Sequence, residues 1–568
     1  MNKILKTLSI AAITTAIIPT GIISANTPIQ APKSVDEVKF DNTDKIKVNE
    51  PVLQSKSTSV DKVPAFKKRI FREKPMKENV LVVMMDFSNS PASTLTKADT
   101  SNYRKKYDKA YYQQLFFGES ITGPDNKKYS SIKKYYQNVS GDSLQLSGQV
   151  SGWYRAKHPL NYYGHNEDAK VSELIMEAAG HVAKDKSIDM NKYDQYDYYD
   201  LDQDGNMKEP DGIVDKFVVV FSGVGESEGG GKFLQNSIWE HVSEVELSKN
   251  GNPKSIAGTH SKYSKLYKNR LGIAEYGILA EDSTVGTFSH EFGHMLGLID
   301  EYDTAPNAES HAGEPIRFWS LMSYGADAGL IPGMEPVGLS PFAKSDLQQI
   351  YGGNWILGSE INYKNISSKK RYYLIDQASI KGVNNDVVKV NLPTIRKKDK
   401  YGKVRNYNHY YLLEWRSHNG VDKGLSHIKD PFGINKYGKG LVIWYVNETY
   451  TDNSNLSKHF GKSLVGVVDA SPSNITTQDG LIPMSDMQLY DAAFNTKSYG
   501  QYNSAKNYFF KKKSTKPVSL FTDKRYSLTS RNNMQVPDSS RVLPQLGLKI
   551  KVEGQNSDGT VGKISIYK

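Results

Sequence analysis

The stretch that decides the fold lies near the middle of the chain and reads Thr287-Phe288-Ser289-His290-Glu291-Phe292-Gly293-His294-Met295-Leu296-Gly297-Leu298-Ile299-Asp300. On a helix, His290 and His294 stand one turn apart on the same face, so both imidazoles can reach one zinc ion. Glu291 then lies beside the water that the metal polarises. The alternative is a core helix with two packed histidines, but the phenylalanines and leucines of the stretch already supply its apolar faces.

A catalytic zinc usually takes three protein ligands and leaves the fourth position to water, so the sequence must supply one more donor. Gly297 can end the helix in a left-handed conformation, which would turn the chain so that Asp300 swings back toward the metal. Asp300 is therefore the predicted third ligand, unless it only braces the turn. The competing candidates are Glu301, Asp303, Glu309, His311 and Glu314.

Downstream, the segment Ser320-Leu321-Met322-Ser323-Tyr324-Gly325 resembles the methionine turn beneath the zinc site of metzincin peptidases. In that setting, Tyr324 would donate a hydrogen bond to a developing oxyanion. The alternative is that Tyr324 is a half-buried packing residue.

An acidic loop predicts a calcium site. The aspartates alternate before Gly205, in the spacing that wraps oxygen ligands around calcium, and the predicted ligands are Asp200, Asp202, Asp204, Asn206 and Asp211. Asp211 stands where the pattern usually has a longer glutamate, which implies weaker or single-oxygen coordination. An acidic surface loop is the alternative.

The amino terminus predicts export. Two lysines within residues 1–6, an apolar stretch at 8–23 and the pair Ser24-Ala25 form the three-part pattern of a secretory signal peptide, residues 1–25. Residues 26–78 are polar without an apolar period and are interpreted as a pro-segment, with a linker as the alternative. The basic cluster Lys67, Lys68, Arg69 and Arg72 indicates a processing site, although a charged linker would have the same composition. With no cysteine among the 568 residues, neither disulfides nor thiolate ligands are available.

The fold class predicted is α+β. A catalytic domain at 79–354 opens with the buried strand Val80 to Met85, continues with a tyrosine-rich helix at 131–139 and a strand at 144–150, and includes a second buried strand at 216–221. Residues 355–568 carry short β-branched or aromatic segments separated by Gly and Asn, and predict an all-β, sandwich-like domain. Its expected strands are 371–375, 387–390, 410–415, 441–446 and 548–552.

Several segments resemble the immune inhibitor A family of secreted bacterial zinc peptidases. They are Val80 to Phe87, Ile132 to Tyr136 with Leu144 to Trp153, Asp200 to Asp215 with Gly223 to Gly231, His290 to Asp303, Tyr411 to Arg416, Gly440 to Trp444 and Asp491 to Phe494. The resemblance implies a metzincin-like catalytic domain, calcium sites, synthesis as a zymogen and activity on host or environmental proteins. It also implies His290, His294 and Asp300 as zinc ligands and Glu291 as the base; Ile299 departs from the proline expected before Asp300.

Together these features predict a secreted, monomeric zinc endopeptidase that acts on protein or peptide substrates through a water activated by metal and Glu291. A net charge of +11 is consistent with a solvated basic surface; no nucleic-acid partner and no lasting membrane insertion are expected. Without a thiolate, latency would need a pro-segment carboxylate such as Asp36, Glu37 or Glu50 at the metal. The competing function is a calcium-dependent extracellular binding protein, in which the β-rich residues from about Trp355 onward recognise a surface and the zinc site is inert or structural.

Overall fold

The computed structural model describes residues 76–568 except 201–202, 247–253, 265–268, 305–313, 379–384, 400, 430–433, 455–460, 472–488, 498–500, 503–515 and 525–541. The predicted signal peptide and most of the predicted pro-segment therefore lie outside the described residues. Within them, helices and strands are mixed, in agreement with the α+β prediction. No helix in this part of the chain has the length and apolar character needed to cross a bilayer.

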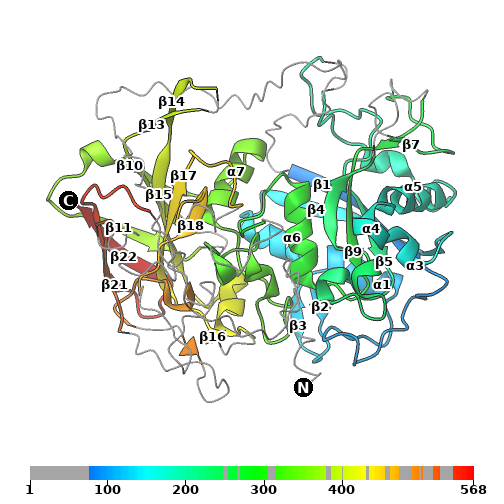
Figure 1. The fold of residues 1–568 in the computed structure, drawn as a ribbon, viewed down its shortest axis with the longest axis horizontal. Coiled ribbons are helices and arrows are strands. Elements are labelled where there is room, and N and C mark those ends of the chain that lie inside the picture. The colour runs from blue at the N-terminus through cyan, green and yellow to red at the C-terminus, as the bar shows by residue number, and fades with distance from the viewer. Residues whose placement is uncertain are drawn as a thin grey trace, which may run out of the picture.

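The amino-terminal half is built on a five-stranded sheet (Figure 1, right). Its strand order is β4 (Leu144–Arg155), β1 (Met76–Asp86), β5 (Phe217–Phe221), β9 (Glu275–Ala280) and β6 (His241–Glu244). Neighbouring strands are parallel except β6, which runs antiparallel to β9 at the edge. The strands predicted in this half are confirmed, although β1 begins at Met76, before the predicted domain start, and β4 continues to Arg155.

Helices cover both faces of this sheet, which explains why its central strands are almost continuously apolar. Alternate residues of β1 enter two separate cores: Val80, Val82 and Met84 on one face, Leu81, Val83 and Met85 on the other. The first core takes residues from α1 (Lys109–Phe117), α2 (Ile132–Val139), α6 (Val285–Met295) and α7 (Pro341–Tyr351). The second takes residues from α3 (Leu160–Tyr163) and α5 (Val171–Val182).

The carboxyl-terminal half contains two larger sheets (Figure 1, left). One has the order β10 (Gly358–Asn362), β12 (Val387–Asn391), β15 (His409–Arg416), β17 (Gly440–Asn447) and β18 (Val465–Val467). The other has the order β11 (Arg371–Asp376), β22 (Val561–Tyr567), β21 (Lys549–Gln555) and β20 (Leu520–Thr522). All five segments expected as strands here are strands.

The sheet that contains β15 and β17 is buried on both faces. Leu413 and Ile443 lie in one core with residues of the β22 sheet, whereas Leu412 and Trp444 lie in a second core with Trp319, Val337 and Phe342 from before residue 355. Every residue of β15 is consequently buried. The two halves thus share a continuous apolar core rather than being joined only by a linker.

Candidate metal centre

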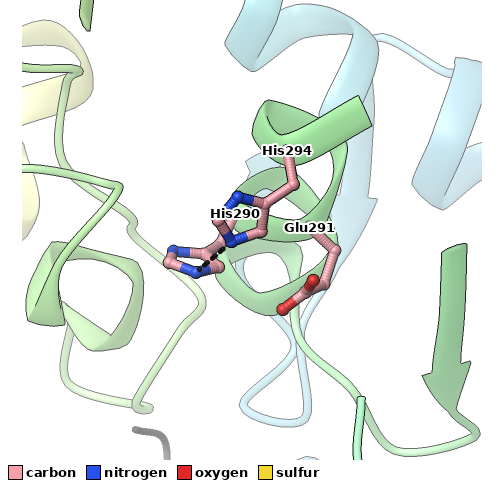
Figure 2. Close-up of side chains that lie close together, drawn as sticks. All are labelled: His290, Glu291 and His294. Atoms are coloured by element: carbon pink, nitrogen blue, oxygen red, sulfur yellow. Dashed lines mark hydrogen bonds between the residues drawn. The ribbon is translucent and has the colours of Figure 1, made fainter. Parts of the chain in front are cut away.

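Helix α6 presents the two histidines. Thr284 caps its start by accepting a hydrogen bond from the Thr287 amide, and the side chains of Phe288 and Phe292 pack into the core beneath the sheet. Their burial leaves His290 and His294 on the other side of the helix, half-buried, with their rings turned toward each other (Figure 2). The Glu291 carboxylate lies beside them.

The end of α6 redirects the chain. Gly297 has φ of 97°, the left-handed conformation predicted for it, and its amide donates to the His294 carbonyl at 2.8 Å. The carbonyls of the last turn have buried partners: Lys216 Nζ donates to Met295 O and the Tyr351 hydroxyl donates to Leu296 O, each at 2.8 Å. The turn is therefore fixed, and it returns Asp300 toward the histidines.

Three ligand atoms converge at this point. His290 Nε2 and His294 Nε2 are 3.2 Å apart, and Asp300 Oδ1 lies 3.2 Å from each of them. A tetrahedral zinc with bonds of about 2.0–2.1 Å has ligand atoms about 3.3 Å from one another. The donor set and its spacing therefore fit zinc.

Backbone carbonyls fix which nitrogen of each imidazole faces this point. His290 Nδ1 is 2.9 Å from Leu321 O, and His294 Nδ1 is 2.9 Å from Leu298 O. Since a carbonyl only accepts, each Nδ1 carries the hydrogen and each neutral ring presents the lone pair of Nε2. The site then holds three acceptor atoms that repel one another unless a cation or a proton lies between them.

The electrostatics agree with this description. Burial alone would lower the pKa of His294, but the Asp300 carboxylate raises it to about 9, and the two histidines hold the pKa of Asp300 well below its usual range. Burial raises the pKa of Glu291 to about 7, against the opposing effect of His290 and His294. One ligand atom from each of His290, Glu291 and His294 lies within 4.8 Å of the others, so the general-base candidate lies next to the histidines.

The competing ligands point elsewhere. The Glu301 carboxylate accepts from the Ser340 hydroxyl at 2.5 Å, and the Glu314 carboxylate accepts from the Arg317 amide at 2.8 Å. Both side chains are buried, and burial raises the pKa of each to about 7. Asp303 is half-buried, and Glu309 and His311 lie outside the described residues.

The methionine turn lies directly beneath α6. Met322 is fully buried, and a Cβ atom on Gly293 would lie 2.6 Å from Met322 Sδ, so the helix can approach the turn only where it has a glycine. Tyr324 opens the short helix η7 (Tyr324–Asp327), with the Arg317 guanidinium 3.7 Å from the centre of its ring. Tyr302, which sequence reasoning missed, lies close to both Tyr324 and His290: the centre of its ring is 6.3 Å from that of each.

The predicted calcium ligands differ in burial. Asp200 and Asp211 are buried, whereas Asp204 and Asn206 are exposed, and Asp202 lies outside the described residues. Asp200 Oδ1 accepts from the Gly205 amide at 2.9 Å, which closes the loop.

Buried aspartates that the sequence interpretation did not single out surround Asp211. Asp194 accepts from the amides of Asp211 and Gly212, and Asp197 and Asp215 are also buried. Asp211 Oδ2 accepts no hydrogen bond from any described residue. The acidic loop therefore leads into an interior cluster of carboxylates.

Two family models and several curated relatives match this chain. Residues 67–356 match the family described as immune inhibitor A peptidase M6, catalytic domain, and residues 404–564 match the immune inhibitor A-like metallopeptidase VEG domain. The chain is 27% identical, across 86% of its length and 69% of the relative, to the pre-pro-metalloprotease PrtV of Vibrio cholerae serotype O1 (strain M66-2). It is 26% identical, across 91% of its length and 96% of the relative, to Immune inhibitor A of Bacillus thuringiensis subsp. alesti.

Proposed function

Because the chain belongs to the immune inhibitor A peptidase M6 family of metalloproteases, we propose that it is a secreted zinc endopeptidase that hydrolyses peptide bonds of extracellular or host proteins. The observation that carries the proposal is the convergence of His290 Nε2, His294 Nε2 and Asp300 Oδ1 at 3.2 Å from one another. Three protein ligands leave one position for water, as in catalytic rather than structural zinc sites.

Zinc held by His290, His294 and Asp300 would supply Lewis-acid chemistry: it would lower the pKa of a bound water toward 7 and polarise the substrate carbonyl. Glu291 would accept the proton of the attacking water as the water oxygen bonds to the carbonyl carbon, and would deliver it to the amine nitrogen as the C–N bond breaks. The carbonyls of Leu321 and Leu298 hold the imidazoles in the ligating tautomer throughout, and Tyr324 is the proposed donor to the oxyanion.

The edge strand β6 supports an extended substrate. β6 is the last strand in the order of its sheet, so among the described residues only β9 pairs with it. β6 also contacts the zinc helix α6. A peptide that adds to such an edge forms main-chain hydrogen bonds along its length. We therefore propose that substrate strands bind beside β6.

The function is tested by replacing Glu291 with Gln. Zinc content and melting temperature should stay as in the unchanged chain, while casein hydrolysis should fall by about 10²–10⁴-fold, the usual contribution of a general base. A zinc-selective chelator should abolish hydrolysis by the unchanged protein. Full activity of Glu291→Gln, or hydrolysis insensitive to the chelator, would refute the proposal. Unchanged turnover of Tyr324→Phe would remove only the oxyanion role.

We propose in addition that calcium stabilises the fold through the aspartates around Asp211. Burial, together with neighbouring Asp194 and Asp215, raises the pKa of Asp211 well above its usual range, and a divalent cation would relieve this repulsion. Calcium should raise the melting temperature of the unchanged chain more than that of Asp211→Asn. Equal melting temperatures with calcium and with a calcium-selective chelator would contradict this.

Latency as a zymogen is a further proposal. The candidate residues Asp36, Glu37 and Glu50 lie outside the described residues, and a carboxylate at the fourth zinc position would block water. Mass spectrometry of the secreted chain tests whether the segment before β1 is removed.

A further inference from the structure

Two segments that support the metal centre are held by side chains from the carboxyl-terminal half. One segment carries Asp300 and Glu301, and the other is the turn with Leu321 and Met322. The segments contact each other, since the Glu301 amide donates to Met322 O at 2.8 Å. The side chains that hold these segments therefore determine the position of Asp300, the proposed third ligand. They also determine the position of the Leu321 carbonyl, which fixes the tautomer of His290.

Asn453 holds the first segment. Its side chain is 1% exposed, and Nδ2 donates to Glu301 O at 2.6 Å and to Val465 O at 2.9 Å. Oδ1 accepts from the Val465 amide at 3.1 Å. Because that amide can only donate, it must face Oδ1, and this fixes the amide group so that Nδ2 faces the two carbonyls.

The anchor behind Asn453 is rigid. Val465 begins β18, which pairs with β17 in the sheet buried on both faces. Asn453 therefore connects this sheet to the peptide that directly follows Asp300.

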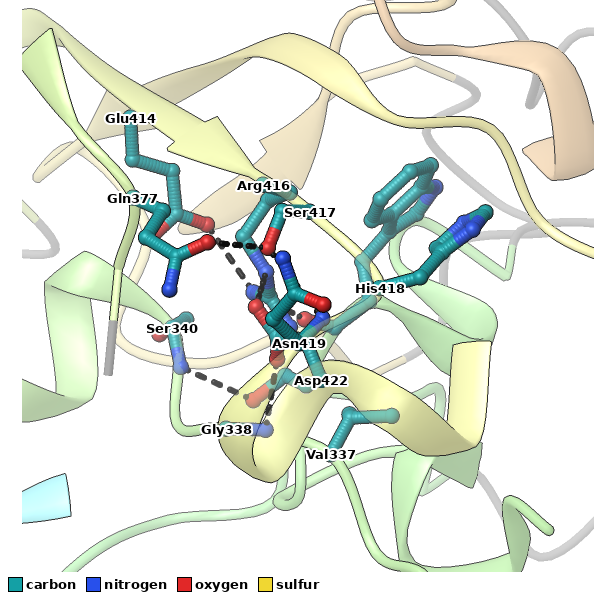
Figure 3. Close-up of polar contacts among 12 residues, drawn as sticks. Val337, Gly338, Ser340, Gln377, Glu414, Arg416, Ser417, His418, Asn419 and Asp422 are labelled. Atoms are coloured by element: carbon teal, nitrogen blue, oxygen red, sulfur yellow. Dashed lines mark hydrogen bonds and ion pairs between the residues drawn. The ribbon is translucent and has the colours of Figure 1, made fainter. Parts of the chain in front are cut away.

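Arg416 holds the second segment (Figure 3). Its Nη1 donates to Trp319 O at 2.9 Å, and its guanidinium forms two bonds with the Asp422 carboxylate. Asp422 Oδ1 also accepts from the Gly338 amide at 3.1 Å, and Gly338 O accepts from the Leu321 amide at 3.1 Å. Leu321 O in turn accepts from His290 Nδ1. A chain of hydrogen bonds thus runs from β15 to the imidazole.

We propose that Asn453 is a positioning residue for Asp300, so that the carboxyl-terminal half sets the zinc affinity of a site whose ligands all come from the amino-terminal half. The proposal rests on the zinc function proposed above. Groups that orient ligands without touching the metal typically change metal affinity by about 10–100-fold when they are removed. Asn453 would act through the Glu301 carbonyl in this way.

The test is Asn453→Ala in the full chain, with Asn495→Ala as the matched control. Asn495 is also buried in the carboxyl-terminal half, at 2% exposed, and its Nδ2 donates to Lys439 O at 3.0 Å. The hydrogen bonds of its side chain reach Lys439, Gln555 and Thr496, which lie in neither segment. Zinc dissociation constants come from competition with a chromogenic chelator, and the visible spectrum of the cobalt-loaded protein reports ligand geometry. Asn453→Ala should bind zinc about 10–100-fold more weakly with an altered cobalt spectrum, whereas Asn495→Ala should retain both properties of the unchanged chain.

The outcomes separate the two proposals. If the unchanged chain binds neither zinc nor cobalt, the zinc function itself fails. If it binds both, and Asn453→Ala matches it in affinity and spectrum, the positioning role is refuted. Equal losses in Asn453→Ala and Asn495→Ala would also refute it, because they would indicate general destabilisation. Should Asn453→Ala not fold, Asn453→Ser, whose hydroxyl is too short to reach Glu301 O, is measured in its place.

Discussion

Replacing Arg416 with methionine should weaken the junction between the two halves. The Arg416 side chain is fully buried and donates to Asp422, to Glu414 Oε1 at 3.0 Å and to Trp319 O (Figure 3). Methionine fills similar space but leaves two carboxylates in the interior without their cation. Glu414 keeps a bond from Trp444 Nε1, and Asp422 keeps the Gly338 amide.

Breaking a buried ion pair by removing one partner costs about 3–5 kcal/mol, because the remaining charge is uncompensated. The surface pair of Arg405 and Asp399 provides the comparison: Arg405 is 54% exposed although its Nε lies 2.6 Å from Asp399 Oδ2. An exposed pair contributes about 0–1 kcal/mol. Arg405→Met should therefore cost much less than Arg416→Met.

Urea unfolding followed by tryptophan fluorescence measures the difference, because Trp319 is bonded to Arg416 and both Trp415 and Trp444 are fully buried nearby. Adding Asp422→Asn to Arg416→Met should recover part of the loss, since it removes one uncompensated charge. The claim is that the Arg416 guanidinium compensates the buried carboxylates of Asp422 and Glu414. It would be refuted if Arg416→Met lowered the free energy of unfolding by less than about 1 kcal/mol, or if the double variant recovered none of the loss.

Three further predictions follow from the geometry. Asp300→Asn should weaken zinc binding by more than the roughly 100-fold upper limit for supporting residues, as measured by chelator competition; unchanged affinity would exclude Asp300 as a ligand. His409 is 1% exposed, and burial lowers its pKa from 6.5 to about 4. As the pH falls, this imidazole is therefore protonated in the unfolded chain before it is protonated in the folded chain. The contribution of neutral His409 to the free energy of unfolding should be complete above pH 6.5 and should fall by roughly 3 kcal/mol as the pH drops toward 4. The urea midpoints of His409→Gln should lack this part of the acid sensitivity. Gly293→Ala should lower the melting temperature because the new methyl group would lie 2.6 Å from Met322 Sδ, whereas Gly180→Ala, with nothing within 4 Å in α5, should raise it; an increase in both would indicate that Met322 can move aside.

The parts of the site that sequence reasoning predicted are those set by local geometry. The spacing of His290 and His294 follows from the helix period, and Gly297 is a residue that adopts a left-handed turn readily. The strand β1 was visible as a continuous apolar run because it is covered on both faces. Its neighbour β4 extends past the predicted end because Arg155 pairs with Asp86, the last residue of β1.

The parts that were missed depend on pairings with no periodic signal. Asn453 and the Glu301 carbonyl are 152 residues apart, and Arg416 and the Trp319 carbonyl are 97 apart. The acidic loop was interpreted from its own spacing, but the interior aspartates, such as Asp194, approach Asp211 from earlier in the chain. A lone buried Asn, Arg or Asp has the same appearance in sequence as one on the surface, so only the assembled fold reveals its partner.

The close packing of Met322 against α6 bears on how the protein withstands oxidants. Sulfoxide formation requires a peroxide to reach the thioether, and this sulfur has no exposed surface. Since the sequence contains no cysteine, the residues beneath the metal centre include no thiol that could be oxidised. The structure around α6 would therefore have to open before bleach or hydrogen peroxide could oxidise Met322.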